Sequence, residues 1–366
     1  MTLHFYFARK FLAAFAAILG AFFLLNVMID MVDHLRRFDS AEVGFAEAFG
    51  LALLRTPESL YGILPLLTVL ATIALFLNLA RSSELVVTRA SGRSALRSVA
   101  APAIAAMLIG ALGVAAVNPI VAATAKRYAV LEARYESGAE RVLSIGREGL
   151  WLRQGGPQGQ TVIHAAAANR DGTRLADVSF FGFDPAGAAI YRIRAESAAL
   201  LPGAWQLGPG KRWSFGTDAA NPERAAERFD TLRLSSDLTA TQIRDSFGAP
   251  ATIAVWDLPG FIAQLEQAGF SATPHRVFLQ VELAMPLLLA AVVLVAAGFT
   301  MRHARFERTG MMGLFALLAG IALFFLRNFA QVLGENGQIP ALVAAWTPPL
   351  AGLLLALGLL LHLEDG

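Results

Sequence analysis

Six long stretches without a charged residue, three on each side of one polar block, dominate the pattern of this chain. Each contains no Asp, Glu, Lys or Arg over 18 or more residues: Phe11–Ile29, Ser59–Ala80, Ser98–Ala125, Leu283–Met301, Thr309–Leu326 and Asn336–Leu363. A helix of that length crosses roughly 30 Å of hydrocarbon. The pattern therefore predicts an α-helical membrane protein with six transmembrane helices.

The polar block between the third and fourth stretches, Lys126–Glu282, predicts an inserted all-β domain. Its apolar residues mostly alternate with a period of two, which is typical of half-buried strands. Turn signals such as Asp171-Gly172 and Pro209-Gly210 separate the segments. The candidate strands are Glu148–Arg153, Gln160–Ala165, Arg174–Asp184, Ala188–Leu201, Ala204–Leu207, Lys211–Phe215 and Arg228–Leu234. Short strands at this spacing indicate a sandwich or jelly roll.

One helix is expected at the end of the β domain, near residues 257–269. Asp257 can cap its start, and Gly269 stands where a C-terminal glycine belongs. Its apolar face consists of Leu258, Phe261, Ile262 and Leu265. We therefore expect three parts: residues 1–125 with the first three transmembrane helices, 126–273 with an all-β domain of the sandwich or jelly-roll kind, and 274–366 with the last three helices.

Composition supports the membrane assignment and restricts the chemistry. The 366 residues are 56% hydrophobic and 16% charged, so the apolar excess belongs in lipid. A net charge of +2 is too small for a nucleic-acid binder, and the lack of cysteine excludes disulfides and thiol nucleophiles. The chain has no phosphate-loop, H-E-x-x-H or G-x-S-x-G pattern, and its six histidines lack metal-ligand spacing. We expect no catalytic residue, metal site or cofactor in this chain.

The distribution of Lys and Arg predicts that both termini face the cytoplasm. With the N-terminus inside, the cytoplasmic segments hold nine basic residues: Arg9, Lys10, Arg81, Arg89, Arg93, Arg97, Arg302, Arg305 and Arg308. The short outer loops hold four, which are Arg36, Arg37, Arg55 and Arg327. Six crossings then place the β domain on the outer side, which for a bacterial inner membrane is the periplasm.

The interiors of the predicted spans carry neutral polar groups such as Asn26, Thr68 and Asn118, while Asp30 and Asp33 are placed at the outer end of the first span. An ion-driven carrier usually needs ionisable groups at mid-membrane, where each costs about 2.5–3.5 kcal/mol on insertion scales. If this protein moves a substrate, we therefore expect the energy to come from a separate subunit.

The predicted cytoplasmic loop Arg81–Arg97 contains a short amphipathic helix near residues 82–92. Ser82 or Ser83 can cap it, Glu84 lies in its first turn, and Gly92 ends it. Such a helix suits docking into a groove on a soluble partner. A helix that lies on the membrane and only connects two spans is the alternative.

The segment Ser83-Glu84-Leu85-Val86-Val87-Thr88-Arg89-Ala90-Ser91-Gly92 closely resembles the coupling-helix motif of the lipopolysaccharide-export permeases, the LptF/LptG family. The resemblance extends over nearly the whole chain. Asp30-Met31-Val32-Asp33-His34-Leu35 is more similar to the LptG branch than to the LptF branch. Weaker similarities lie in Pro57-x-x-Leu60-Tyr61-x-x-Leu64-Pro65, Glu148-Gly149-Leu150-Trp151 and Ile339-Pro340…Ala345-Trp346-x-Pro348.

The resemblance implies a permease subunit of an ATP-driven ABC transporter, which extracts lipopolysaccharide from the inner membrane for export to the outer membrane. It implies a second, LptF-like permease subunit and a cytoplasmic LptB-like ATPase dimer that binds ATP and Mg. It also implies handover to periplasmic jelly-roll proteins of the LptC and LptA kind. Apart from these proteins, the expected partners are lipopolysaccharide and membrane lipid, and no nucleic acid. The alternative is a membrane-anchored scaffold or sensor whose periplasmic domain binds a ligand.

The resemblance also assigns residues. The motif helix engages the ATPase through Glu84, with Leu85, Val87 and Arg89 as neighbours. Candidates for the cavity or lateral gate in the first and fifth spans are Phe22, Phe23, Met28, Leu323, Phe324 and Phe325, for which lipid-facing packing is the alternative.

Arg36 and Arg37 are candidates for the phosphates of the lipid headgroup, since guanidinium groups pair well with phosphate, although a solvated pair at the membrane edge is the alternative. Asp30 and Glu282 depart from the family pattern, because relatives carry a basic residue there. Arg327 is a candidate to compensate for that difference.

Overall fold

The computed structural model describes residues 2–38, 44–90, 92, 94–137, 144–146, 149–156, 159–169, 172–215, 223–224, 226–236, 238, 249–267, 271–301 and 309–365. The chain forms two compact units. The membrane unit comprises Met1–Tyr135, Ala251–Trp256 and Thr273–Gly366. The β-unit comprises Glu136–Pro250 and Asp257–Ala272.

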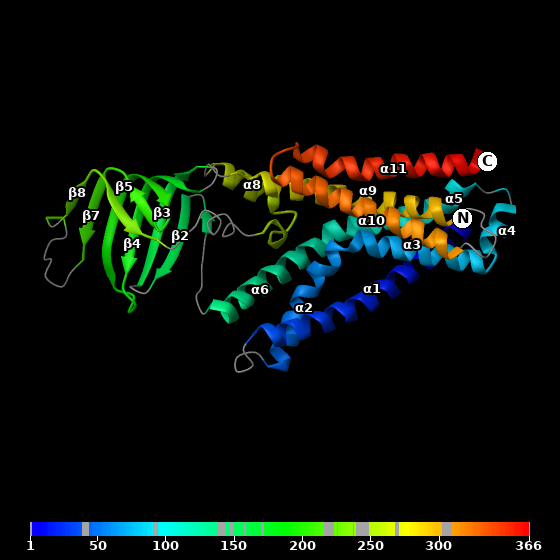
Figure 1. The fold of residues 1–366 in the computed structure, drawn as a ribbon, viewed down its shortest axis with the longest axis horizontal. Helices are drawn as coiled ribbons and strands as arrows, with labels where there is room; N and C mark the ends of the chain where they lie inside the picture. The colour runs from blue at the N-terminus through cyan, green and yellow to red at the C-terminus, as the bar shows by residue number, and fades with distance from the viewer. Residues whose placement is uncertain are drawn as a thin grey trace. The chain divides into compact units, whose positions relative to one another are not determined.

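Six helical segments among the described residues are long and apolar enough to cross a bilayer, which confirms the predicted membrane fold (Figure 1). The spans are Leu3–Arg37, Leu64–Arg81, Ala95–Glu132, Thr273–Thr300, Gly310–Glu335 and Ala341–His362. They are formed by α1 (Thr2–Arg37), α3 (Leu64–Arg81), α5 (Ala95–Leu112) continued by η1 (Gly113–Val117) and α6 (Asn118–Ser137), α9 (Thr273–Thr300), α10 (Thr309–Glu335) and α11 (Ala341–Asp365).

Helix α9 is the centre of the membrane unit. It packs against α3, α5, α10 and α11, and its side chains are buried almost continuously along its second half. A Cβ atom on Gly110 of α5 would lie 2.7 Å from Cα of Pro286 in α9, so the two backbones approach as closely as a glycine allows. Helices without a hydrophobic driving force between them gain most from such close packing.

Several predicted span boundaries differ from the structure, most clearly in the first two spans. The stretch Ser59–Ala80 is interrupted at Ile63, because α2 (Phe45–Gly62) ends there and α3 begins with Pro65 in its first turn, where a missing N–H breaks no helical bond. Helix α1 continues to Arg37, beyond the predicted end at Ile29. The basic turn that was predicted to hold Arg302, Arg305 and Arg308 lies outside the described residues.

The β-unit contains a nine-stranded antiparallel sheet among its described residues, which confirms the predicted inserted all-β domain. The strands, in the middle of the colour range of Figure 1, are β1 (Ser144–Gly146), β2 (Gly149–Gly156), β3 (Gly159–Ala168), β4 (Arg174–Phe183), β5 (Ala189–Leu201), β6 (Ala204–Leu207), β7 (Gly210–Ser214), β8 (Glu227–Phe229) and β9 (Leu232–Ser235). The main path runs β1-β2-β3-β4-β5-β6-β9, while β7 pairs with β5 and β8.

Strand β5 organises this sheet because it has two partners on different parts of its length. Its residues Tyr191–Ala195 pair with β7, and Ala198–Leu201 pair with β6. Side chains alternate along it, so that Ile193 and Ala195 are buried while Arg192 and Arg194 are exposed. The buried set joins Phe180 and Trp205, whose rings meet edge to face with centroids 6.2 Å apart.

The predicted strand Arg228–Leu234 is wrong, because the chain turns at Asp230 and forms two strands instead. β8 pairs with β7 and β9 pairs with β6, so the two halves lie on different edges of the sheet. The predicted helix is confirmed as α8 (Leu258–Gln267), in which Leu258, Ile262 and Leu265 are buried. The backbone carbonyl of Asp257 accepts the first helical bond, from N of Phe261 at 3.0 Å. Gly269 lies outside the described residues.

Candidate functional site

The motif helix forms as predicted and is attached by a sharp turn to the end of the second span. Helix α3 ends at Arg81, and α4 spans Glu84–Ala90. Between them Ser83 adopts a left-handed backbone with φ of 58°, and its carbonyl accepts the bond from N of Val87 at 3.2 Å. Gly92 has φ of 78°, a conformation in which a glycine is favoured after a helix end.

The carboxylate of Glu84 is bound to helix α1. Nζ of Lys10 lies 2.8 Å from Oε1 and 2.9 Å from Oε2, and the hydroxyl of Tyr6 donates to Oε2 at 3.0 Å. Oγ of Ser82 donates to Oε1 at 3.0 Å. A carboxylate offers about four lone-pair positions, and these four bonds occupy them. The hydrogen bond from Lys10 is the main reason that the pKa of Glu84 is held below its usual range.

The other motif residues point in different directions. Leu85 is buried in the core of the membrane unit, whereas the side chain of Val87 is 68% exposed. Thr88 is buried, and its hydroxyl donates to the carbonyl of Glu84 at 2.7 Å. The side chain of Arg89 lies outside the described residues. Helix α4 thus has an inner side fixed to the bundle and an outer side that includes Val87.

The predicted gate residues divide into inner and outer positions. Phe22 of α1 packs against the core and Leu323 of α10 is part of it. Phe23 and Met28 on α1 are exposed, as is Phe325 on α10. Phe324 is half-buried, and its ring meets that of Phe325 with centroids 6.2 Å apart. Both helices therefore present apolar side chains outward, to lipid or to another protein.

The predicted headgroup residues have unequal surroundings. Arg36 is exposed and forms no ion pair with any residue that the structure describes. Arg37 forms an ion pair with Glu132 on α6, with Nη1 and Oε1 2.8 Å apart. Arg327 on α10 is attracted electrostatically to Glu282 and Glu335. Of the three, only Arg36 thus has no ion pair or electrostatic attraction to an acidic group shown within the described part of the chain.

The prediction that the span interiors hold only neutral polar groups is wrong. Glu282 was placed just before the fourth span, but α9 begins at Thr273 and therefore includes Glu282. This residue is buried, with 1% of its surface exposed. Burial of this carboxyl group is possible because the hydroxyl of Tyr61 and Nδ2 of Asn118, at 3.2 Å, both donate to Oε2. Arg327 supplies a countercharge.

Asn118 extends this buried polar network to the segment Ala251–Trp256. Its Oδ1 accepts a bond from N of Val255 at 2.8 Å, and Nε1 of Trp256 donates to the carbonyl of Ala115 at 3.1 Å. Ala115 belongs to η1, a π-helical turn, where the normal i to i−4 bonding is interrupted. The network therefore joins α2, the third span, α9 and this segment.

A second polar group surrounds the C-terminal part of α1, and its member Arg55 was predicted to lie in a loop but belongs to α2. His34 is buried, and its Nε2 lies 3.0 Å from the hydroxyl of Tyr128. On α2, Nε of Arg55 lies 3.9 Å from Oδ1 of Asp30, and Nη1 of Arg55 lies 3.8 Å from Oδ2 of Asp33. These contacts tie α1 to α2 and α6, which explains why α1 continues beyond Ile29. No group of metal-ligating side chains occurs among the residues with described positions.

These features define a class of protein: a multi-pass membrane protein with two sets of three spans, an inserted β-unit and a short motif helix between its second and third spans. The chain matches the family described as lipopolysaccharide export system permease LptF/LptG over residues 5–362, and it belongs to that family. Lipopolysaccharide export system permease protein LptG of Haemophilus influenzae is 23% identical over 380 residues, covering 100% of this chain and 99% of that protein. The chain is therefore a multi-pass inner-membrane permease of the lipopolysaccharide export system.

Proposed function

We propose that this chain is the LptG-branch half of an ATP-driven transporter that extracts lipopolysaccharide from the inner membrane. The similarity of Asp30–Leu35 to that branch and the full-length match to an LptG protein support the branch assignment. The other half is an LptF-like permease, and an LptB-like ATPase dimer binds ATP and Mg. The basic loops favour cytoplasmic termini and a periplasmic β-unit, which hands lipid to LptC-like and LptA-like jelly-roll proteins.

The observation that carries this proposal is the attachment of α4 to α1 through Glu84. Leu85 fixes the inner side of α4 in the bundle, and the exposed Val87 offers an apolar contact to a soluble partner. Because Lys10 and Tyr6 both bind the Glu84 carboxylate, a force on α4 is passed to α1. A direct contact between Glu84 and an ATPase has to displace one of these donors.

Movement of α1 matters because this helix carries half of the proposed gate. Met28 on α1 and Phe325 on α10 are 63% and 66% exposed, which suits contact with acyl chains or with the second permease. Arg36 is the preferred contact for a headgroup phosphate, since Arg37 and Arg327 already have acidic neighbours. The family assignment does not favour the alternative of a scaffold or sensor.

Two variants in the reconstituted complex test the attachment of α4. Val87→Glu places a charge on the outer side of α4 and should abolish copurification of the ATPase. Lys10→Met should keep the ATPase bound but lose ATP-dependent release of lipopolysaccharide, and Glu84→Ala should behave in the same way. Arg9→Met is the matched control, because Arg9 is the exposed neighbour of Lys10 and carries the same charge.

Equal lipid release by Lys10→Met and Arg9→Met would refute the role of the Lys10–Glu84 pair. Loss of the ATPase in Glu84→Ala, with normal ATPase binding in Lys10→Met, would instead assign Glu84 to a direct contact with the ATPase.

A further inference from the structure

A row of three cations crosses the exposed face of the sheet in the β-unit. Arg194 on β5 pairs with Lys211 on β7, and Lys211 pairs with Arg228 on β8. Residues paired in this way place their side chains on the same face, where like charges repel one another. The neighbours of Arg194 on its strand, Ile193 and Ala195, are buried on the opposite face. The row is therefore separate from the apolar interior of the β-unit.

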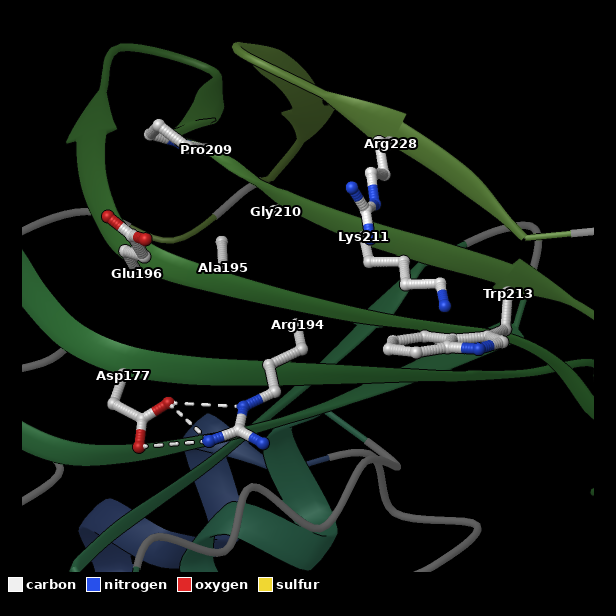
Figure 2. Close-up of a pocket in the computed structure, with 9 residues that line it drawn as sticks. All are labelled: Asp177, Arg194, Ala195, Glu196, Pro209, Gly210, Lys211, Trp213 and Arg228. Carbon is white, nitrogen blue, oxygen red and sulfur yellow. Dashed lines mark hydrogen bonds and ion pairs between the residues drawn. The ribbon is translucent and has the colours of Figure 1, made fainter. Parts of the chain in front are cut away.

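The three cations line an open pocket with a volume of about 450 Å³ (Figure 2). Trp213 lies on the same face, two residues after Lys211. Its ring centroid is 5.2 Å from Nζ of Lys211 and 5.6 Å from Cζ of Arg192. Gly210 forms part of the pocket wall, and a Cβ atom there would lie 2.3 Å from the carbonyl oxygen of Arg194. A glycine is thus required where β7 approaches β5. The volume falls within the range of roughly 300–1,000 Å³ that is usual for small-ligand pockets.

Three carboxylates, those of Asp177, Glu196 and Glu223, lie beside the three cations and formally balance their charge. Asp177 accepts bonds from Nε and Nη2 of Arg194 at 3.3 and 3.2 Å (Figure 2), and Glu223 binds Lys211 and Nε1 of Trp213. The side chains of Asp177 and Glu223 are 58% and 66% exposed, so water weakens both ion pairs. An anion with a higher charge density can therefore compete with them for the cations.

We propose that this pocket binds a phosphate group carried on a sugar. The guanidinium groups of Arg194 and Arg228 present forked donors that match phosphate oxygens, and Lys211 adds a third cation between them. The indole of Trp213 lines the pocket beside them and supplies apolar surface for contact with a sugar ring. The position of all three cations around one small pocket favours a compact ligand over a protein partner, whose interface normally buries about 800 Å² on each side.

The test uses the full-length permease in nanodiscs of neutral lipid, without an ATPase, and measures binding by isothermal titration calorimetry. Glucosamine 1-phosphate, inorganic phosphate and glucosamine are the probes. Arg228→Gln should weaken binding of glucosamine 1-phosphate about tenfold, because it removes a charge-assisted contact. Arg233→Gln is the matched control, since Arg233 is an exposed arginine on β9, outside the row.

A second variant changes affinity in the opposite direction. Asp177→Asn releases Arg194 from its ion pair and should tighten binding about threefold. Asn tolerates the left-handed backbone of this position, where φ is 45°, so the strand is retained. A gain in affinity cannot result from misfolding, which keeps the test informative if Arg228→Gln is poorly folded.

The probes distinguish the two sources of phosphate. Tighter binding of glucosamine 1-phosphate than of inorganic phosphate supports a glycolipid headgroup, and equal binding of both supports recognition of free phosphate. Equal affinities of Arg228→Gln and Arg233→Gln, or weaker binding by Asp177→Asn, would overturn the proposal. Displacement of the sugar phosphate by a pentaglutamate peptide at equal concentration would also overturn it, because the face would then bind acidic protein. None of these outcomes depends on the transport proposal.

Discussion

Replacing Tyr61 by Phe should destabilise the membrane unit through a single lost hydroxyl. That hydroxyl donates to Oε2 of Glu282, and both side chains are buried. Removing one donor from a buried acceptor costs about 1–3 kcal/mol, and more when the acceptor is charged. Asn118 remains as a donor to Oε2 at 3.2 Å, so the carboxyl group keeps one partner. We therefore expect the free energy of unfolding to fall by about 2 kcal/mol.

Tyr6→Phe is a matched control because it removes the same chemical group from the same type of bond. The Tyr6 hydroxyl donates to Oε2 of Glu84 at 3.0 Å, but the Glu84 side chain is 32% exposed and water can replace the donor. Exposed pairs of this kind contribute less than about 1 kcal/mol. Burial is thus the main difference between the two tyrosines, and the cost at Tyr61 should be clearly larger.

A double-mutant cycle with Glu282→Gln measures the contribution of charge. A neutral acceptor reduces the value of the bond to about 0.5–1.5 kcal/mol, so Tyr61→Phe should cost about 1 kcal/mol less in the background of the Glu282→Gln variant. Unfolding by sodium dodecyl sulfate in mixed micelles, followed by circular dichroism, supplies the free energies. Equal costs at Tyr61 and Tyr6 would show that the buried network does not hold the spans together. Equal costs in both backgrounds would show that the charge of Glu282 does not strengthen the bond.

Three further predictions concern other parts of the chain. The pKa of Glu84 is lowered in the folded state. The contact of α4 with α1 should therefore be complete above the ordinary glutamate pKa of about 4.3, and it should be lost as the pH falls through the lower folded-state pKa. Spin-label distances between the two helices measure this loss. Gly110→Ala should lower the free energy of unfolding by about 1–3 kcal/mol, because the new methyl group clashes with Pro286. Gly20→Ala, where no atom lies near the added Cβ, should raise it by up to about 1 kcal/mol in the same unfolding assay. Trp205→Ala should destabilise the β-unit by about 3–5 kcal/mol in thermal denaturation, because the side chain is fully buried.

The apolar spans and most strands could be predicted because each follows from a local pattern. An uncharged run of sufficient length indicates a span, and alternation indicates a strand, as for Ala204–Leu207, which is β6. The interruption at Ile63 was missed because no charge marks it, although Pro65 in the next turn is a signal of a helix start. The short strand β1 has only three residues, too few to show alternation.

The candidate sites depend on contacts between residues that are far apart in the sequence. Glu84 was identified from its motif, but its partners Lys10 and Tyr6 are 74 and 78 positions away. Glu282 lies 221 positions from Tyr61, and no helical periodicity can select that partner. The position of Glu282 directly before an apolar run was the available signal, since a helix that continues backwards through it carries the carboxyl group into the bundle.

The π-helical turn at Gly113–Val117 has a consequence for the comparison of relatives. A turn of this type accommodates one residue more than an α-helical turn. The side chains before and after it therefore point in the same directions as in an unbroken α-helix that is one residue shorter. A relative that lacks one residue here therefore still directs its equivalent of Asn118 toward α9. An alignment that matches such a relative to this chain without a gap would assign the wrong residues to the faces of the third span on one side of the turn.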